Sequence, residues 1–214
     1  MINLYKEKIA ELIKADNYSE AFIYCGHALR ENQNDHEIQQ IAAFIFKRIN
    51  DAHIELKPET SEDYLHRGIA NFYAGETESS IYDYSMAIEL DESNDYAFKS
   101  RHISYAALGK INESLKDIVR AIEINPTNAW YRMDLANLLS LLPDKKNEAL
   151  SNYLKSVELE PTSEILWYNF GVELQAQGYI QDAILKYTKA IEINPNYEDA
   201  VWNYNYCKGL LGNN

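Results

Sequence analysis

The most regular pattern in the sequence is that of residues 164–197, EILWYNFGVELQAQGYIQDAILKYTKAIEINPNY. Its first half places apolar residues at the spacing of an α-helix, and the pair Gly178–Tyr179 then interrupts the pattern. A second apolar stripe follows and ends at Pro195, a residue type that cannot continue a helix. Small residues such as Gly171 and Ala183 would let two helix backbones approach closely. The stretch therefore predicts two helices joined by a tight turn.

The same pattern recurs upstream with a nearly constant period. The motifs ELDES, EINPT, ELEPT and EINPN begin at residues 89, 123, 158 and 192, so their spacings are 34, 35 and 34. Small residues and turn glycines keep this period, namely Ala87, Ala121, Ser156 and Ala190 with Gly75, Gly109 and Gly178. Because several registers share one period, the sequence divides into repeat units. These units are 61–94, 95–128, 129–163 with one inserted residue near Leu142–Pro143, and 164–197.

The two ends of the chain depart from this period. Residues 1–60 are predicted to form one helix pair over 2–35 and then one long helix over 36–56, which Pro58 ends. Residues 198–214 supply a single helix, which would cover the exposed face of the last unit.

This pattern resembles the tetratricopeptide repeat (TPR) family, closely in 164–197 and less closely toward the N-terminus. The resemblance implies an all-α fold, a right-handed superhelical solenoid of antiparallel helix pairs with a C-terminal capping helix. In such a solenoid the first helices of successive units line a concave groove. Positions 2, 5, 9 and 12 of each unit are then expected to face a partner.

Those positions hold many aromatic and aliphatic residues. The implied partner-binding groove consists of Leu65, Ile69, Phe72, Tyr96, Lys99, Ile103, Trp130, Met133, Asn137, Tyr168, Val172, Trp202 and Tyr206. Exposed apolar surface of this kind often marks a binding site, although packing between neighbouring helices would explain some of these residues equally well.

One specialisation of the family does not fit. Chaperone-binding members grip a C-terminal carboxylate with Lys and Asn on one helix, Asn on the next, and Lys and Arg on the third. Here Met133 and Asn137, then Asn169, then Asp199 and Asn203 occupy those positions, so a carboxylate would meet few cations. We therefore do not expect this chain to use that clamp.

Two arginines are predicted to be structural. Arg67 and Arg101 share position 7 of their units, and position 23 holds Asp83 and Asp117 in the same two units. The later units lack both the arginine and the aspartate. Because an unpaired charge between helices is costly, the pairs Arg67–Asp83 and Arg101–Asp117 are expected to bridge the helices of each unit.

The sequence carries no motif typical of catalysis, metal binding or phosphate binding. His102 stands where other units have a small residue, and is expected either to pack against Ser114 or to respond to pH or ligand. The histidines and the two cysteines, Cys25 and Cys207, show no metal-binding or disulfide spacing. No phosphate-cradling loop or nucleophile motif is present. We expect no enzymatic activity, no cofactor and no metal.

Charge and hydropathy limit the partners. The net charge is −13, and residues 61–94 carry eight acidic residues against the single Arg67. Such a chain repels phosphate polymers, so no nucleic acid is expected. No apolar run reaches the ~18 residues of a membrane span, and no secretory signal is visible, which favours a cytoplasmic protein without membrane insertion.

These observations favour a non-enzymatic protein–protein interaction scaffold. Its groove would bind an extended or helical peptide segment of basic or amphipathic character. The alternative is a TPR-type chaperone that shields apolar segments of a secreted or assembling client. The N-terminal helices are a candidate homodimer surface, and a regulatory subunit of an enzyme is a third class.

Overall fold

The chain is a succession of α-helices. The computed structural model describes residues 2–32, 34–51 and 58–212. The helices are α1 (Ile2–Lys14), α2 (Tyr18–Glu31), α3 (His36–Asp51), α4 (Ser61–Tyr73), α5 (Thr77–Leu90), α6 (Asp95–Ala107), α7 (Ile111–Ile124), α8 (Ala129–Ser140), α9 (Lys146–Leu159), α10 (Glu164–Ala176), α11 (Ile180–Ile193) and α12 (Glu198–Gly212), with a 3₁₀ helix, η1 (Pro143–Lys145). No strand occurs in these ranges, which confirms the all-α prediction.

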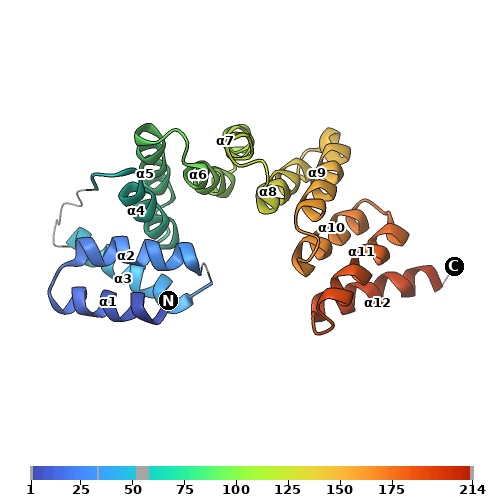
Figure 1. The fold of residues 1–214 in the computed structure, drawn as a ribbon, viewed down its shortest axis with the longest axis horizontal. Coiled ribbons are helices and arrows are strands. Elements are labelled where there is room, and N and C mark those ends of the chain that lie inside the picture. Colours follow the sequence, from blue (N-terminus) through green and yellow to red (C-terminus); the bar gives the residue numbers. More distant parts are fainter. Residues whose placement is uncertain (1, 33, 52–57, 213–214) are drawn as a thin grey trace. The chain divides into compact units, whose positions relative to one another are not determined.

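The helices fall into two compact units, each larger than a repeat unit. The first unit is Met1–Ile124 with α1 to α7, and the second unit is Asn125–Asn214 with α8 to α12. Within them, α4 packs with α5, α6 with α7, α8 with α9 and α10 with α11 as antiparallel neighbours (Figure 1). Helix α12 packs on α11, as the predicted capping helix does. The last two residues of the predicted cap, 213–214, lie outside the described residues.

A left-handed residue ends the first helix of four pairs. Its backbone φ is 54° at Asp16, 88° at Gly75, 69° at Gly109 and 84° at Gly178. The next residue donates its backbone N–H to a carbonyl five residues back, as in Asn17 to Leu12, Glu76 to Asn71, Lys110 to Tyr105 and Tyr179 to Leu174. Glycine favours this helix end because it has no Cβ. Since Asp16 adopts the same conformation, α1 and α2 are joined as the later pairs are.

The pair α8/α9 is joined differently. Pro143 stands where the other units have the turn glycine, and its ring holds φ at a negative value. The connection runs instead through η1, in which Lys145 donates its backbone N–H to the carbonyl of Leu142 at 2.9 Å. The extra residue near Leu142–Pro143 is therefore accommodated as a 3₁₀ turn.

Glycines set the distance between paired helices. A Cβ atom added to Gly68 would lie 2.6 Å from Cε1 of Tyr84, and one added to Gly171 would lie 2.6 Å from Cε1 of Tyr187. Both tyrosines belong to the second helix of the pair and are buried. A tyrosine ring therefore fills the space that the missing side chain leaves.

The N-terminal helices pack in a less regular way. Helix α3 buries the predicted apolar face of Ile38, Ala42, Ile45 and Ile49, and α2 packs against α1, α3 and α4. The contact between α2 and α4 is close, because a Cβ on Gly26 would overlap the carbonyl oxygen of His66. The predicted helix extends to residue 56, but residues 52–57 lie outside the described residues.

Candidate functional site

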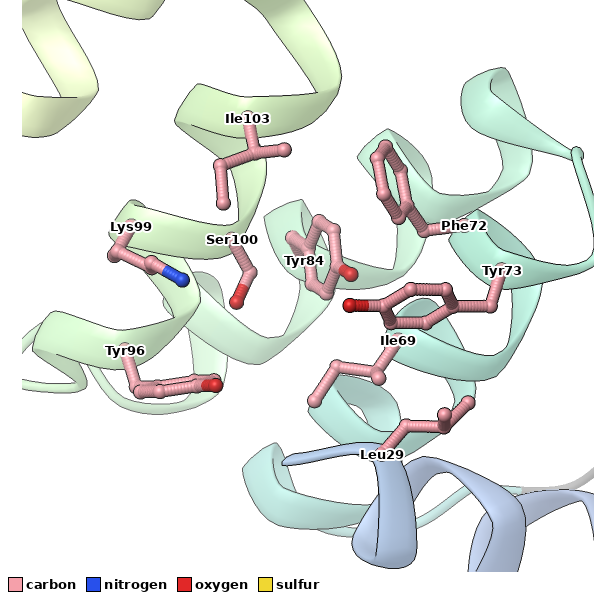
Figure 2. A pocket seen from close by; sticks show the side chains of 9 residues that line it. All are labelled: Leu29, Ile69, Phe72, Tyr73, Tyr84, Tyr96, Lys99, Ser100 and Ile103. Carbon is pink, nitrogen blue, oxygen red and sulfur yellow. The ribbon is translucent and has the colours of Figure 1, made fainter. Parts of the chain in front are cut away.

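A small pocket lies in the first unit and is lined by side chains of α2, α4, α5 and α6. Its volume is about 100 Å³, close to the size of one amino-acid side chain rather than of a folded segment. Figure 2 shows aromatic rings and aliphatic side chains surrounding it, with one lysine at its edge. The lining residues are Leu29, Ile69, Phe72, Tyr73, Tyr84, Tyr96, Lys99, Ser100 and Ile103.

Most groove positions expected in the first unit meet at this pocket. Repeat positions 9 and 12 of α4 and positions 2, 5 and 9 of α6 all line it, through Ile69, Phe72, Tyr96, Lys99 and Ile103. The prediction for Leu65 is wrong, because that side chain is 0% exposed. Leu65 belongs to the hydrophobic core of this unit, which the N-terminal helices share with α4. It therefore contributes to stability and offers no surface to a partner.

Two phenol groups face the pocket. Tyr84 is 2% exposed and Tyr73 is partly buried, and both hydroxyls point into the space in Figure 2. Burial raises the pKa of Tyr73 to about 12 and raises the pKa of Tyr84 well above its ordinary value, with nearby Tyr96 adding to both effects. Both groups are therefore neutral near pH 7 and can donate a hydrogen bond.

Two cations approach the ring of Tyr96. The guanidinium carbon of Arg30 lies 4.8 Å from the ring centroid, and Nζ of Lys99 lies 5.3 Å from it. Arg30 also donates to Oε2 of Glu62 at 2.7 Å, so its charge is balanced. In the part of the chain that the structure describes, no carboxylate lies within 4 Å of the Lys99 ammonium. Lys99 is thus the pocket's uncompensated charge.

The groove positions of the second unit lie on α8, α10 and α12. Asn137 and Val172 are exposed, whereas Trp130, Met133 and Tyr168 are partly buried. Side-chain contacts link the three helices, because Asn169 Nδ2 on α10 donates to Met133 Sδ at 3.4 Å and Asn203 Nδ2 on α12 donates to Tyr168 Oη at 3.3 Å. The hydroxyl of Tyr153 on α9 donates to Oδ1 of Asn137. Trp130, Met133, Asn137 and Tyr168 line neither the pocket of the first unit nor the cleft beside Pro195 and Trp202.

The last helix presents the most exposed aromatic surface. Trp202 is 65% exposed and Tyr206 is 48% exposed, and their rings stack with centroids 5.5 Å apart and planes inclined by 4°. Trp202 also lines an open cleft together with Pro195, Glu198 and Val201. A stacked pair at helical spacing that remains open to solvent has the composition of an interaction surface.

The two arginines of the first unit contact the aspartates that the repeat comparison paired with them. Arg67 donates from Nε to Oδ2 of Asp83 at 3.0 Å, and Arg101 donates from Nε to Oδ2 of Asp117 at 2.7 Å. Asp83 is 1% exposed and also accepts from Asn71 Nδ2 at 2.8 Å. Burial raises the pKa of Asp83, and the bonds from Arg67 and Asn71 oppose that rise.

The later units use other contacts at these positions. In the unit 164–197, position 7 is Phe170, and the Lys186 ammonium lies 5.0 Å from its ring centroid. In the unit 129–163, Arg132 donates to Oδ1 of Asn152 at 3.4 Å. Each of the four repeat units thus has a cation between its two helices. Among the described residues, that cation pairs with a buried carboxylate in the repeat units 61–94 and 95–128, with Asn152 in 129–163 and with the Phe170 ring in 164–197.

Two buried histidines behave differently from each other. His102 packs against Ser114, whose hydroxyl lies 2.7 Å from Nδ1, and burial lowers the pKa of His102 to about 4. His66 is 2% exposed and its ring stacks on His27 with centroids 3.4 Å apart. Neither ring nitrogen of His66 has a hydrogen-bond partner in the described structure, and burial lowers its pKa to about 3. Both histidines are therefore neutral near pH 7.

The described residues carry no recognisable catalytic or metal chemistry. Among them no three His, Cys, Asp or Glu side chains come together as a metal site. Cys25 and Cys207 are buried free thiols, and burial raises the pKa of Cys25 to about 12, far from the range of a nucleophilic thiolate. A search of the same residues for a helix able to cross a membrane finds none.

Sequence reasoning missed four residues of the pocket. Tyr73, Tyr84 and Ser100 lie at repeat positions 13, 24 and 6, which the groove pattern excludes. Leu29 comes from α2, which reaches the pocket because it packs directly on α4. The tyrosine opposite Gly68 was a detectable signal, since Gly171 and Tyr187 repeat the same spacing 103 residues later. Leu29 left no such signal.

Comparison with known proteins agrees with this architecture. The model of the family described as "Tetratricopeptide repeat" matches residues 165–197. The heat shock protein STI1 of Saccharomyces cerevisiae is 32% identical over 108 residues, which are 49% of this chain and 18% of that protein. A small glutamine-rich tetratricopeptide repeat-containing protein of Dictyostelium discoideum is 34% identical over 106 residues, 49% of this chain and 31% of that protein.

Human tetratricopeptide repeat protein 13 is 24% identical over 152 residues, 69% of this chain and 17% of its own length. The chain thus spans less than a third of these curated relatives. Among solved structures, TTC0263, a thermophilic TPR protein of Thermus thermophilus, superposes with a TM-score of 0.64 at 15% identity, covering 97% of this chain and 98% of that one. YrrB, "a TPR protein with an unusual peptide-binding site", gives 0.59 at 18% identity, covering 92% and 88%.

Consecutive antiparallel helix pairs with a period of 34 or 35 residues, four of which share a left-handed end of the first helix, define an α-helical repeat protein. The sequence match at 165–197 and the relatives above specify the kind of repeat. Residues 165–197 match the tetratricopeptide repeat, and over a longer stretch the chain is similar to proteins that contain this repeat.

Proposed function

We propose that this protein is a non-enzymatic interaction scaffold that binds a peptide segment of another protein. The observation that carries the proposal is the pocket of the first unit, because five groove positions from two different helices line it together. A pocket with aromatic and aliphatic walls and a few polar groups suits a side-chain anchor. YrrB, named for its peptide-binding site, and the first TPR of Spaghetti, solved with an HSP90 peptide, have similar folds.

The proposed ligand is a basic or amphipathic segment. The unit 61–94 carries eight acidic residues, and several of them, including Glu62, Glu76 and Glu78, are exposed. Such a surface attracts a basic segment and steers it toward the pocket, four of whose lining residues, Ile69, Phe72, Tyr73 and Tyr84, belong to the unit 61–94. The net charge of −13 opposes nucleic acid as a partner. Two free thiols without a disulfide are consistent with a reducing, cytoplasmic setting.

Affinity capture from a cell lysate tests the scaffold function. Phe72→Ala and Ile103→Ala remove apolar walls of the pocket, and we expect each to release captured proteins that the parent chain retains. Tyr82→Ala is the matched control, because Tyr82 is 59% exposed on α5 and does not line the pocket. If the two pocket variants retain the same proteins as the control, the pocket is not the binding site.

A chaperone that shields apolar client segments is the second candidate. The exposed stack of Trp202 and Tyr206 favours it, because open aromatic surface suits unfolded apolar segments. One relative is named a heat shock protein. The N-terminal helices, where Leu4 is 69% exposed and Phe44 is 51% exposed, are the proposed homodimer surface. Light scattering separates monomer from dimer, and suppression of client aggregation separates chaperone from scaffold.

A further inference from the structure

The polar side-chain groups around the pocket of the first unit are donors or hydroxyls. They are the ammonium of Lys99 and the hydroxyls of Tyr73, Tyr84, Tyr96 and Ser100, and no carboxylate lines the space. A ligand group that enters this pocket therefore meets one positive charge and several O–H groups. A cationic or purely donating group would find no acceptor with a negative charge there.

Two of these hydroxyls lack protein partners. Within the described residues, neither Tyr73 nor Tyr84 donates a hydrogen bond to another protein group, although Tyr84 is only 2% exposed. A hydroxyl that points into a cavity and has no protein partner can donate a hydrogen bond to an acceptor that enters the cavity. Because burial keeps both phenols protonated, each can donate to that acceptor.

Lys99 adds the charge that selects the acceptor. Its ammonium lies 5.3 Å from the Tyr96 ring centroid and within 4 Å of no carboxylate in the described structure. The neighbouring Arg30 differs, because Glu62 compensates it. A carboxylate in the pocket would pair with Lys99 and accept from the tyrosine hydroxyls, forming charge-assisted hydrogen bonds.

We propose that the pocket binds the carboxylate of an internal glutamate or aspartate side chain of the bound segment, with Lys99 and the hydroxyls of Tyr73 and Tyr84 as its recognition groups. The methylene groups of that side chain would lie against Ile69 and Phe72. A volume of about 100 Å³ suits one short side chain, whereas a terminal residue would bring a carboxylate and its own side chain together. The inference rests on the proposed peptide-binding function and adds the residue that anchors the peptide. The bound segment would be basic overall and would carry one acidic residue at its centre.

A displayed peptide library tests this inference. Twelve randomised residues are inserted between two folded carrier domains, so that no free terminal carboxylate is present, and segments are selected on the whole chain. We expect the selected segments to share one glutamate or aspartate next to apolar residues. Replacing that glutamate by glutamine in a selected segment should weaken binding at least about tenfold, since a buried charged pair is lost.

Variants of the chain assign the contact. Lys99→Met should weaken binding as much as the glutamine replacement in the segment, and the two changes together should cost little more than either alone. Tyr84→Phe and Tyr73→Phe remove only hydroxyls without protein partners, so they keep the fold and should each weaken binding several-fold. Lys116→Met is the control for net charge, because Lys116 is exposed on α7 away from the pocket.

The outcomes separate this inference from the proposed function. If segments bind at the pocket but the glutamine replacement is neutral, the acidic anchor is overturned and the scaffold function stands. If segments bind only when a free C-terminus is offered, a terminal carboxylate is the ligand and the internal anchor is overturned. If no segment binds the chain while its circular dichroism is that of a folded helical protein, the peptide-binding function fails, and the anchor with it.

Discussion

The carboxylate of Asp83, 1% exposed, accepts hydrogen bonds from the guanidinium of Arg67 sixteen residues earlier in the chain. The same spacing joins Arg101 to Asp117 one unit later. Both pairs connect the first helix of a unit to the second. Their positions are filled by Leu135 with Asn152, and by Phe170 with Lys186, in the later units. The repeat thus tolerates either a complete ion pair or no buried carboxylate at this place.

That relationship predicts an unequal effect of single and double substitutions. Arg67→Leu leaves the buried Asp83 without its main partner and should lower the free energy of unfolding by about 3 kcal/mol. The double variant Arg67→Leu with Asp83→Asn imitates the unit 129–163 and should recover most of that loss. Urea unfolding followed by circular dichroism measures both.

A control for the ion pair lies at the surface. Arg120→Leu removes an exposed pair with Glu123, and its effect should stay within about 0.5 kcal/mol. An Arg67→Leu variant as stable as this control would show that the buried pair contributes nothing to the fold.

Helix-to-helix distance gives a second prediction. Gly171→Ala places a Cβ 2.6 Å from the ring of Tyr187, which is 0% exposed and has no room to move away. We expect a loss of about 1–3 kcal/mol in unfolding free energy from overpacking. Gly209→Ala is the matched control in α12, because nothing lies within 4 Å of its added Cβ.

The unfolding free energy should therefore decrease in Gly171→Ala and increase in Gly209→Ala. In a helix without steric conflict, alanine is favoured over glycine by about 0.5–1 kcal/mol, so Gly209→Ala should be stabilising. Thermal unfolding of the two variants in parallel gives the comparison. Equal changes for both would mean that Tyr187 does not set the spacing of α10 and α11.

Protonation of His66 gives a third prediction. Burial, and then nearby His27 and Arg30, lower the pKa of His66 to about 3, whereas Glu62 and Asp63 face it and favour its charged form. A histidine with its folded pKa below its unfolded value stabilises the fold above pH 6.5 and loses that contribution as the pH falls toward 3. Between these two pH values the unfolded state binds one proton more than the folded state at this histidine. The unfolding free energy therefore falls by up to about 1.4 kcal/mol for each pH unit of acidification.

The comparison of variants isolates this histidine from the carboxylates that titrate in the same range. We expect the unfolding free energy of the parent chain to fall more steeply between pH 6 and pH 4 than that of His66→Leu. Val119→Ala, at an exposed side chain with no titratable group, should keep the slope of the parent. Identical slopes for the parent and His66→Leu would contradict the assignment.

The period of the sequence predicted the helix pairs, their turns and the partners of Arg67 and Arg101, because each of these depends on residues within one 34-residue unit. It could not predict that Leu65 is buried or that Leu29 lines the pocket. Both facts follow from the direct packing of α2 on α4. In the sequence these two helices are separated by the segment that contains α3, where the period is interrupted. Contacts between units that break the repeat leave no periodic signal.

The stacked aromatic pair of α12 gives the last prediction. Trp202 is 65% exposed, so Trp202→Ala should change the unfolding free energy by no more than about 0.5–1 kcal/mol. Its loss should nevertheless weaken binding of an apolar client segment, because a ligand would cover the ring. Tryptophan fluorescence during titration with an unfolded client protein measures this, since covering the ring changes its emission. Leu185→Ala, at a side chain that is 60% exposed on α11, controls for a general loss of apolar surface. If both variants bind the client as the parent does, the α12 surface is not a client site, and the peptide-binding pocket of the first unit remains the candidate for partner recognition.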